Sequence, residues 1–479
     1  MPLSWDLARV WPCDDEAMPD FNGDLRNATD RATLIGDAAR RAIRYGARTP
    51  QLPVSPADAA LDELGRFAAA LPADGAAPGD VLALLDDIGS PATVRSTGGR
   101  YFGFVTGGSD PVATAASILA TAWDQNSALP VMSPVAARLD AIVSHWIPGL
   151  LGLAPTVTSS FCAGASIANL TCLVAARDAL LRRAGWDVAA DGLVGAPPIH
   201  VVTSAEIHVS VPKALRVIGI GDSAISYVPT DNCGRLELDS FPSLDRHTLV
   251  IAQAGNVNTG HSDPFVEIIA ATREADGWVH VDGAFGLWAA ASPDHRHLVT
   301  GVEAADSWAT DAHKWLNVPY DSGIAICADG DDLSFSMAAG AAYLPAEEGR
   351  APMHLGLQMS QRARAIETWA VLATRGSSGI AELIASSCRL AYRFATLLAD
   401  GGAEILAPVV LNQALVAFGD DDTTDAVIAA TQRDGTCWAG GTTWQGIRAM
   451  RISVSDTATT DADIETSAKA ILSCWATCR

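Results

Sequence analysis

The sequence predicts an α/β protein with a mostly parallel central sheet in a large domain, a helical N-terminal segment and a small α+β C-terminal domain. Two observations predict this class. Short apolar segments rich in Val and Ile alternate with helical patterns in the middle of the chain, and the pattern changes near residue 356. Strands without polar alternation are typical of a parallel sheet covered on both faces. Because 479 residues are too many for one core, we expect domains at 1–95, 96–355 and 356–479.

The N-terminal segment, residues 1–95, is expected to be helical. Apolar residues recur at helical spacing from Ala28 to Tyr45 and again from Ala57 to Ala70. The stretch Leu71–Gly79 contains two prolines and two glycines, which is typical of a linker. A segment this small and apolar is not expected to be stable alone.

Residues 96–355 contain the predicted central sheet. The expected strands are Ile199–Thr203, Ile225–Val228, Thr248–Ala252, Trp278–Val281 and Ile324–Ala328. The expected helices are Ala168–Arg183, Val211–Ile218 and Pro264–Ala275. Because strands and helices alternate, we expect the strands to run mostly parallel.

Residues 356–479 show a different order of elements. Two long helical stretches come first, followed by strands and helices in turn. The expected elements are helices Ser360–Thr374 and Ile380–Leu398, strand Ala414–Phe418, helix Ala426–Gln432, strand Met450–Val454 and helix Asp461–Trp475. This order indicates a small α+β domain.

Composition excludes several classes of function. The formal net charge is −23, which argues against a nucleic-acid or anionic-membrane partner because both require clustered Lys and Arg. No uncharged apolar run approaches the length that crosses a bilayer, and the first residues lack an apolar signal core. The nine cysteines are dispersed without a CxxC pair. Reduced thiols and a cytoplasmic location are therefore expected.

A lysine and an aspartate carry the strongest chemical signal. Lys314 lies within Asp311–Trp315, and Asp282 follows the apolar run Trp278–Val281. A lysine can hold an aldehyde as a Schiff base, and a carboxylate at a strand end can pair with a pyridinium nitrogen. Together the two residues indicate a pyridoxal phosphate site. Taken singly, a lysine is more often a surface charge and an aspartate more often a turn or helix cap.

Three other features fit the same cofactor. Ala284 is small enough to lie flat against a ring, and His208 follows a predicted strand and can stack on the opposite ring face. The small residues of Phe161–Asn169 open a predicted helix, where backbone N–H groups and the Ser166 hydroxyl can approach a phosphate. A structural histidine and an ordinary capped turn would look the same. These features therefore depend on the lysine and the aspartate.

In this order, the segments resemble the pyridoxal phosphate-dependent group II amino-acid decarboxylases, which include aromatic amino-acid, valine and diaminobutyrate decarboxylases. The resemblance covers roughly residues 95–370, and Asp311–Trp315 with the eight residues that follow is its most specific part. The resemblance implies a fold-type I enzyme that binds pyridoxal 5'-phosphate. It also implies a homodimer with shared active sites and an N-terminal segment that takes part in dimerisation.

The resemblance also implies roles for single residues. Lys314 would be the catalytic Schiff-base lysine, Asp282 the partner of the pyridinium nitrogen, and His208 a stacking residue that assists protonation. The other cofactor-binding residues would be Ala284, Asn256, Ala165, Ser166, His313 and Asp311. Tyr343 matches the tyrosine of a mobile loop that protonates the substrate carbon after CO₂ leaves.

The chain departs from the family pattern at several positions. Ile167 stands where a Glu usually follows the phosphate-binding Ser, and Gly99-Arg100 replaces a usual His-Pro. Asn256 takes the position of a threonine and can still donate a hydrogen bond. Asp311 stands where aromatic decarboxylases have Asn, and an anion near a phosphate is unfavourable unless it is paired. These changes indicate a distinct subfamily.

The expected function is decarboxylation of an L-amino acid to the amine and CO₂. A hydrophobic or aromatic substrate is slightly favoured because aromatic side chains are candidates for the pocket. The candidate substrate-binding residues are Tyr101, Phe102, Phe104, Trp123 and Arg451. Each of the aromatic residues could equally belong to the core, and Arg451 could equally form a structural ion pair.

Other functions remain open on the sequence alone. The same cofactor supports aminotransferases, carbon–carbon lyases and aldehyde synthases, although a tyrosine at position 343 favours decarboxylation over aldehyde synthesis. A non-catalytic protein on the same fold is a further alternative, against which the intact Lys314 and Asp282 argue. A metal site at His280, Asp282, His295 and His297 is disfavoured because no helical i, i+4 pair exists, and we expect no metal.

Overall fold

The protein is described here by a computed structural model that covers residues 30–67, 70–340 and 350–478. The chain divides into two compact units. The first unit comprises residues 1–52 and 56–94, and the second comprises 53–55 and 95–479. Within the described parts of the chain, every helix is too short or too polar to cross a lipid bilayer.

The first unit is helical, as the sequence predicts. Its helices are α1 (Arg31–Arg48), α2 (Asp58–Asp62), α3 (Pro78–Leu84) and α4 (Ser90–Ala92). The Asp30 carboxylate accepts a hydrogen bond from the Thr33 N–H and so caps α1. Arg41 donates to Asp37 in the same helix and to Asp86 after α3, which joins the two helices. Helix α3 begins inside the stretch that the composition assigns to a linker.

The second unit contains a seven-stranded sheet in the order β1-β7-β6-β5-β4-β2-β3. The strands are β1 (Thr158–Cys162), β2 (His200–Ser204), β3 (Ile225–Val228), β4 (Thr248–Gln253), β5 (Trp278–Asp282), β6 (Ser307–Asp311) and β7 (Gly323–Cys327). Strands β3, β2, β4, β5 and β6 pair in parallel, and β7 is antiparallel to both β6 and β1. The mostly parallel sheet of the predicted α/β class is confirmed.

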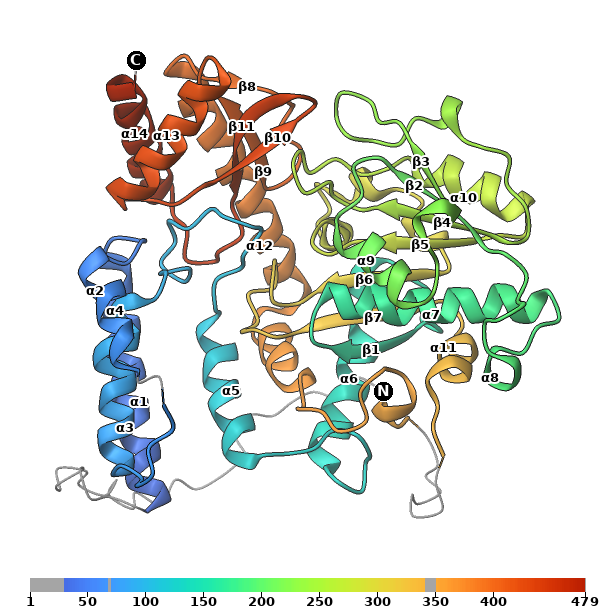
Figure 1. The fold of residues 1–479 in the computed structure, drawn as a ribbon, viewed down its shortest axis with the longest axis horizontal. Helices are drawn as coiled ribbons and strands as arrows, with labels where there is room; N and C mark the ends of the chain where they lie inside the picture. The colour runs from blue at the N-terminus through green and yellow to red at the C-terminus, as the bar shows by residue number, and fades with distance from the viewer. Residues whose placement is uncertain (1–29, 68–69, 341–349, 479) are drawn as a thin grey trace. The chain divides into compact units, whose positions relative to one another are not determined.

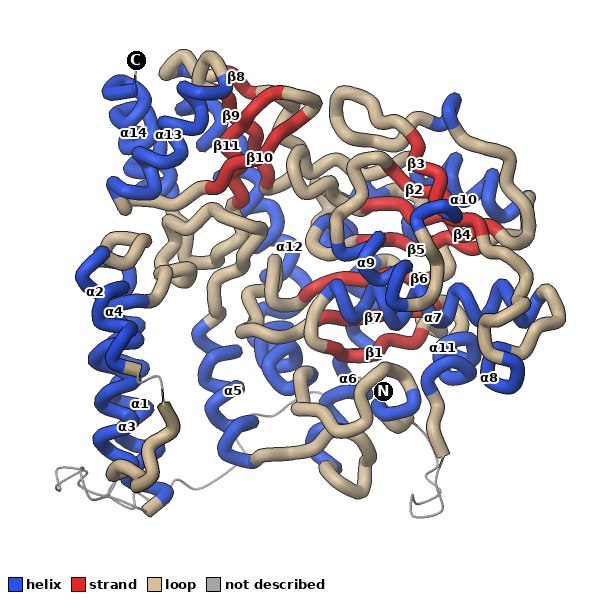
Figure 2. The backbone as a smooth tube through the Cα atoms, viewed as in Figure 1, coloured by secondary structure: helices blue, strands red, loops and turns tan. Residues whose placement is uncertain are grey.

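Helices cover both faces of this sheet (Figures 1 and 2). The helices are α5 (Pro111–Trp123), α6 (Pro134–Leu151), α7 (Ala165–Arg183), α8 (Val188–Asp191), α9 (Ser210–Val217), α10 (Phe265–Glu274) and α11 (Gly330–Met337). Along β2 and β4, Val201 and Leu249 pack with α7, α9 and α11, whereas Val202 and Val250 pack with α6 and α10. Burial on both faces explains why these strands show no polar alternation.

The C-terminal part of the second unit has a sheet of its own. Strands β8 (Glu404–Ile405), β9 (Gln413–Ala417), β10 (Gly440–Trp444) and β11 (Ile447–Ser453) form an antiparallel sheet in the order β10-β11-β9-β8. Helices α13 (Asp421–Asp434) and α14 (Asp461–Cys478) pack with this sheet around a separate core. The two sheets lie on either side of residue 356 in the sequence. The boundary of the C-terminal domain at that residue stays a prediction.

Helix α12 (Ala365–Asp400) belongs to both cores of the second unit. Its first half, including Val371 and Ile380, packs in the core of the seven-stranded sheet, and the end of its second half, including Leu390 and Leu398, packs in the core of the four-stranded sheet. The helix therefore connects the two sheets, as Figure 1 shows in orange. It is interrupted at Gly376, where φ is 60°.

Candidate active site

The polar groups of the candidate site lie at one edge of the seven-stranded sheet. Strands β4, β5 and β6 are parallel neighbours that end at Gln253, Asp282 and Asp311. Because the carboxyl ends of parallel strands meet at one edge, residues far apart in the sequence are brought together there. A cavity of about 140 Å³ lies at this edge, lined by Phe104, Val105, His208, Gln253, Gly255, Val257, Asp282, Ala284, Phe285, Lys314 and Arg451. Six of these residues are predicted site residues.

Asp282 is buried at the end of β5, where its carboxylate faces the cavity. One carboxylate oxygen accepts a hydrogen bond of 3.2 Å from the Ala284 N–H. Burial raises the pKa of Asp282, and the nearby His208 and Lys314 oppose this effect. A buried carboxylate of this kind is stabilised as an anion by a cation in the cavity, such as a protonated ring nitrogen.

Lys314 follows β6 and reaches the cavity beside Asp282. Its Nζ lies 3.2 Å from Oδ2 of Asp311, so the ammonium group is paired with a buried carboxylate. The same Oδ2 lies 3.6 Å from Nε2 of His313. In the Asp-Ala-His-Lys motif, Asp311 thus lies close to the side chains of His313 and Lys314.

Asp311 also contacts the start of α7. Its Oδ1 accepts a hydrogen bond of 2.6 Å from the Ala165 N–H, the first amide of the helix. Gly164 precedes it with φ of 135°, and a Cβ on Gly164 would lie 3.0 Å from Cε1 of His313. Ser166 is exposed in the first turn, and the residue before the helix, Gly164, has no side chain to cap it. The Asp311 carboxylate takes the Ala165 amide, and the positive end of the helix dipole and the exposed Ser166 hydroxyl can still attract an anion.

His313 is held by a main-chain donor and an aromatic ring. Its Nδ1 accepts a hydrogen bond of 3.2 Å from the Ser322 N–H, and its ring centroid lies 4.5 Å from that of Tyr320. Burial lowers the pKa of His313, and the charge of Asp311 opposes this effect. Because Nδ1 accepts, the proton of the neutral ring is on Nε2, which faces Asp311.

His208 lies after β2 and lines the cavity with its imidazole. Its Nδ1 lies 2.8 Å from the Ser210 hydroxyl and accepts from the Ser210 N–H at 3.3 Å. Partial desolvation lowers the pKa of His208, and the charge of Asp282 opposes this effect. The neutral ring therefore carries its proton on Nε2.

Arg451 reaches the same cavity from β11 of the four-stranded sheet. Its Nη1 donates a hydrogen bond of 3.3 Å to the Val257 carbonyl oxygen. Burial lowers the pKa of Arg451, but a guanidinium remains protonated at neutral pH. The structural ion pair considered from the sequence does not occur at this side chain among the described residues. Arg451 is therefore a cation in the cavity wall.

The aromatic candidates occupy different places. The Trp438 ring lies between Tyr101 and Phe104, with centroids 5.1 and 5.4 Å away, and Phe104 lines the cavity. Phe102 does not reach the cavity. It is buried in the core of the four-stranded sheet, against Phe394. The backbone turns at Phe104, where φ is 56°, and Phe104 faces the cavity instead. Trp123 is exposed at the end of α5 and does not line the cavity of its own chain.

Asn256 lies outside the set of residues that line the cavity. Its Oδ1 accepts hydrogen bonds from the Asn258 and Thr259 N–H groups, which closes a turn. A Cβ built on Gly234 would lie 3.0 Å from Nδ2 of Asn256, so the amide points toward Gly234. The side chain that lines the cavity beside Asp282 is instead Gln253.

Two further expectations from the sequence concern Tyr343 and a metal site. Tyr343 lies outside the described residues. His280, considered as a metal ligand, is buried with Nδ1 2.9 Å from the Ser307 hydroxyl and Nε2 2.8 Å from Oδ1 of Asn169. In the described ranges, no three His, Cys, Asp or Glu side chains are close enough together to hold a metal ion.

Comparison with known proteins identifies the family. The family model described as "Pyridoxal-dependent decarboxylase conserved domain" matches residues 80–419, most of the chain. The chain belongs to the pyridoxal-dependent decarboxylase family. Pyridoxal phosphate is therefore its cofactor, and the suspected resemblance is confirmed.

Relatives and solved structures agree with this family. The aromatic-L-amino-acid decarboxylase of Bacillus atrophaeus is 27% identical over 312 residues, 62% of this chain and 63% of the relative. The 4-hydroxyphenylacetaldehyde synthase of Rhodiola rosea is 31% identical over 301 residues, 58% of this chain and 59% of the relative. The matched segment thus spans about three fifths of these relatives. Oryza sativa TDC, solved with PLP and tryptamine, shares the fold, with a TM-score of 0.85, 22% identity and coverage of 94% of this chain and 98% of that one.

The residues of the cavity fit the cofactor. Asp282 offers a buried carboxylate to a ring nitrogen, Lys314 offers an amine to an aldehyde, and Ala284 offers a small flat wall. Nε2 of Gln253 is a buried donor without a hydrogen-bond partner among the described residues, which suits a polar ligand. The start of α7, with its helix dipole and the exposed Ser166, fits a phosphate.

Sequence reasoning missed several residues of this region, three of which have large side chains. Gln253 and Phe285 line the cavity, and Trp438 packs between two predicted pocket residues. The signal for Gln253 is its position, because a polar residue ends the otherwise apolar strand β4 at the same edge as Asp282. Phe285 and Trp438 have no comparable signal, since an aromatic residue in a loop is as typical of the core.

Proposed function

We propose that the protein decarboxylates an L-amino acid to the amine and CO₂, with a hydrophobic or aromatic substrate slightly favoured. The observation that carries the proposal is the meeting of Lys314, Asp282, Ala284 and His208 in one cavity of a chain of this family. A non-catalytic role is disfavoured because the lysine and the carboxylate both face the cavity. The aromatic decarboxylase among the relatives supports the same reaction class.

Each residue of the cavity has a role in this reaction. When bound, pyridoxal phosphate supplies an electron sink for the negative charge left on the substrate carbon. Lys314 holds the cofactor through Nζ, and Asp282 keeps the proton on the ring nitrogen by accepting its hydrogen bond. The start of α7, with Ala165 and Ser166, binds the phosphate. We keep Tyr343 as the proposed acid for the substrate carbon.

His208 contributes its imidazole at the opening of the cavity. Because its pKa is lowered and Nδ1 accepts from Ser210, its Nε2–H is available as a donor at neutral pH. This proton can stabilise negative charge on the substrate and assist protonation after CO₂ leaves. The imidazole would also cover the ring face opposite Ala284.

Arg451 supports a second candidate, transamination on the same cofactor. A guanidinium can bind a carboxylate through two parallel hydrogen bonds, and Arg451 has no carboxylate partner in the described chain. Retention of the substrate carboxylate would favour loss of the α-proton instead of CO₂. The relative that is an aldehyde synthase adds the alternative of aldehyde as a product.

Product analysis separates these reactions. The purified protein, loaded with pyridoxal phosphate, is incubated with single L-amino acids, and amine, aldehyde and keto acid are measured. We expect amine alone, with phenylalanine, tyrosine and tryptophan among the best substrates, and no product from Lys314→Ala. Keto acid that disappears in Arg451→Met would establish transamination instead. A parent chain with no absorbance band near that of a lysine-bound cofactor would contradict the entire proposal.

We propose that the protein acts as a homodimer. Exposed apolar side chains gather on α5, α6 and the segment between them, namely Ile118, Leu119, Trp123, Val131, Met132, Val135 and Trp146. An apolar surface of this extent on one side of a chain is typical of a protein interface. We expect a second copy of the chain to cover it, as the family resemblance implies.

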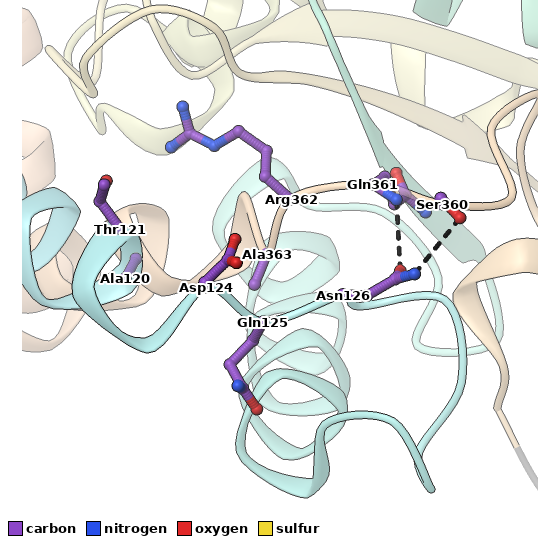
Figure 3. A pocket seen from close by; sticks show the side chains of 9 residues that line it. All are labelled: Ala120, Thr121, Asp124, Gln125, Asn126, Ser360, Gln361, Arg362 and Ala363. Carbon is purple, nitrogen blue, oxygen red and sulfur yellow. Dashed lines mark hydrogen bonds between the residues drawn. The ribbon is translucent and has the colours of Figure 1, made fainter.

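Two hollows adjoin these helices. One, of about 560 Å³, is formed by the end of α5 and residues 360–363. Figure 3 shows Asn126 at one end of it, bonded to Ser360 and Gln361. The other, of about 530 Å³, lies between α6 and α12 beside Trp146 and Leu372. Side chains of a second copy would fill both in the proposed dimer.

Mixed dimers test whether the sites are shared. We propose that Trp123, which is exposed in its own chain, reaches the cavity of the partner. Lys314→Ala and Trp123→Ala would each lower activity alone. A mixed dimer of the two variants would contain one site with both residues intact, so activity would return. No return of activity in a mixture shown to exchange subunits would contradict sharing of this residue.

We also propose a cytoplasmic location. The eight cysteines that the structure describes are free thiols, and burial raises the pKa of Cys162, Cys388 and Cys437 because it disfavours the thiolate. Cell fractionation with antibody detection would test this location. Recovery in an oxidising compartment would contradict it.

A further inference from the structure

Gln253 is a direct strand neighbour of Asp282. The two residues pair in register across the parallel strands β4 and β5, so their side chains point to the same face of the sheet. Both line the cavity, and only 3% of Gln253 is exposed. The side-chain amide is therefore held in the wall of the cavity beside the carboxylate that we assign to the ring nitrogen.

The amide of Gln253 has an unused donor. Nε2 is buried and has no hydrogen-bond partner among the described residues. A buried donor without a partner is unfavourable, and natural proteins seldom keep one unless a ligand or water satisfies it. Asp282 does not serve as this partner, and its carboxylate accepts from the Ala284 N–H instead. The donor is thus directed at a group that enters the cavity.

Asp263 fixes the main chain of Gln253. One carboxylate oxygen of Asp263 accepts from the Gln253 N–H at 2.7 Å, and the Asp263 N–H donates to the Gln253 carbonyl oxygen at 3.0 Å. The other carboxylate oxygen accepts from the Leu236 N–H at 2.8 Å. Because Asp263 is buried, these bonds are shielded from water and hold the end of β4 in place. The position of the amide is therefore set by the surrounding fold.

We infer that Gln253 is a cofactor-positioning residue whose Nε2–H donates a hydrogen bond to the ring hydroxyl oxygen of bound pyridoxal phosphate. The acceptors of this cofactor are its phosphate, its aldehyde, its ring nitrogen and its ring oxygen. The start of α7 takes the phosphate, Lys314 takes the aldehyde, and a protonated nitrogen pairs with Asp282. The ring oxygen is the acceptor that remains for Gln253. The inference rests on the proposed cofactor site and deepens it.

The inference replaces an assignment that the sequence favours. By sequence position, Asn256 is the expected donor, but its amide is turned toward Gly234 and does not line the cavity. Within the described part of the chain, both side chains carry an amide nitrogen without a partner, so the two assignments differ only in which amide faces the cavity. This difference makes them separable by matched substitutions.

The test is a spectrophotometric pH titration of the loaded protein without substrate. The proton that Lys314 shares with the cofactor is released more easily when the ring oxygen receives a hydrogen bond, because the bond stabilises the negative oxygen. In Gln253→Met, which keeps the length of the side chain, we expect the midpoint of the titration to rise by about one pH unit. In Gln253→Glu, a carboxylate beside the oxygen should raise it further.

Asn256→Asp is the matched control for Gln253→Glu because Asp keeps the acceptor that closes the turn, loses the amide donor and adds the same negative charge. We expect its midpoint to equal that of the parent chain. A shift in Asn256→Asp with none in Gln253→Met would overturn the inference in favour of Asn256. An unchanged midpoint in both, with a raised KM in Gln253→Met, would assign the amide to the substrate instead.

The outcomes also separate this inference from the proposed function. If the parent chain shows no band of lysine-bound cofactor, the cofactor site itself is wrong. If the band is present and Gln253→Met leaves its titration unchanged, only the role of Gln253 is wrong. If Gln253→Glu fails to fold, as judged by its thermal unfolding without cofactor, the titration of Gln253→Met alone tests the role of Gln253.

Discussion

Asp311 connects three parts of the site through one carboxylate. It accepts from the first amide of α7, pairs with Lys314 and lies near His313. The same helix start is the proposed position of the cofactor phosphate. Two anions would then share one helix end, which is unfavourable at short range even when the surroundings are polar. The carboxylate therefore opposes the phosphate while it keeps the helix start and the lysine in position.

Removal of this charge should strengthen cofactor binding. In Asp311→Asn, the amide oxygen can still accept from Ala165, but the negative charge is gone. We expect the dissociation constant for pyridoxal phosphate to fall by about tenfold, which corresponds to about 1.4 kcal/mol. Fluorescence quenching by added cofactor measures it. The charge-matched control is Asp222→Asn on the exposed surface, which should bind as the parent does.

The opposite result would change the role of Asp311. Weaker binding in Asp311→Asn, with a normal thermal unfolding curve, would mean that the carboxylate supports the phosphate, for example as a protonated donor. If Asp222→Asn changed the dissociation constant as much as Asp311→Asn, the net charge of the chain would be the cause instead.

Elements of the fold differ in how well the sequence predicts them. Strands β4 and β5 are apolar and buried on both faces, so their composition reveals them within a residue or two. Strand β3 is partly exposed at the sheet edge, and its Ile225 and Val228 reveal it. Strands β1 (TSSFC) and β10 (GGTTW) were not predicted. Their small polar residues are typical of turns, and only pairing with β7 and β11 makes them strands.

The residues of the site also differ in how well the sequence predicts them. Lys314 and Asp282 were predictable because their chemistry is specific to the cofactor and their segments are distinctive. Gln253 was missed although it ends β4 beside Asp282, and the placement of Asn256 was not predictable because it depends on how the loop after β4 turns. Phe102 was misplaced because nothing in the sequence distinguishes it from Phe104, which lines the cavity, whereas Phe102 lies in the core of the four-stranded sheet.

A buried polar network ties α7 to the sheet below the site. His280 of β5 bonds to Ser307 of β6 and to Asn169 of α7, and Trp278 also donates to Ser307. Burial lowers the pKa of His280 to about 3, well below the ordinary value near 6.5. The unfolded chain therefore binds a proton at this residue that the folded chain does not, between these two pH values.

This network predicts a pH dependence of stability. The contribution of His280 is fully present above pH 6.5 and is lost as pH falls toward about 3. In His280→Asn, the free energy of unfolding should depend less on pH in that interval, by about 1.4 kcal/mol per pH unit. Urea unfolding at pH 4.5, 5.5 and 7 measures the slope. Equal slopes for parent and variant would show that His280 becomes protonated in the folded state.

The interruption of α12 at Gly376 predicts an effect on stability. Its φ of 60° and ψ of −179° belong to a region that is essentially restricted to glycine. Gly376→Ala should lower the free energy of unfolding by about 1–3 kcal/mol, although a Cβ there would meet no atom within 4 Å. The control is Gly149→Ala in α6, whose Cβ would also meet no atom within 4 Å.

Thermal or urea unfolding of the two variants compares them directly. Because Gly149 lies in a regular helix without a positive φ, its replacement should be neutral or stabilise by about 0.5–1 kcal/mol. Equal effects of the two substitutions would mean that α12 straightens in solution.

At the level of the whole molecule, two sheets contribute to one cavity. Lys314 and Asp282 come from the edge of the seven-stranded sheet, and Arg451 comes from the four-stranded sheet. Since α12 belongs to both cores, it holds these contributions at a fixed spacing. The reaction then depends on the arrangement of the second unit as well as on the motif around Lys314.

The central claim is that the carboxylate of an amino acid leaves as CO₂ at this cavity. The most direct test is incubation of the loaded protein with L-phenylalanine, L-tyrosine or L-tryptophan labelled with ¹³C at the carboxyl carbon. We expect labelled CO₂ and amine in equal amounts from at least one of them, and neither from Lys314→Ala. Consumption of any of these substrates with the label retained in a keto acid would contradict decarboxylation.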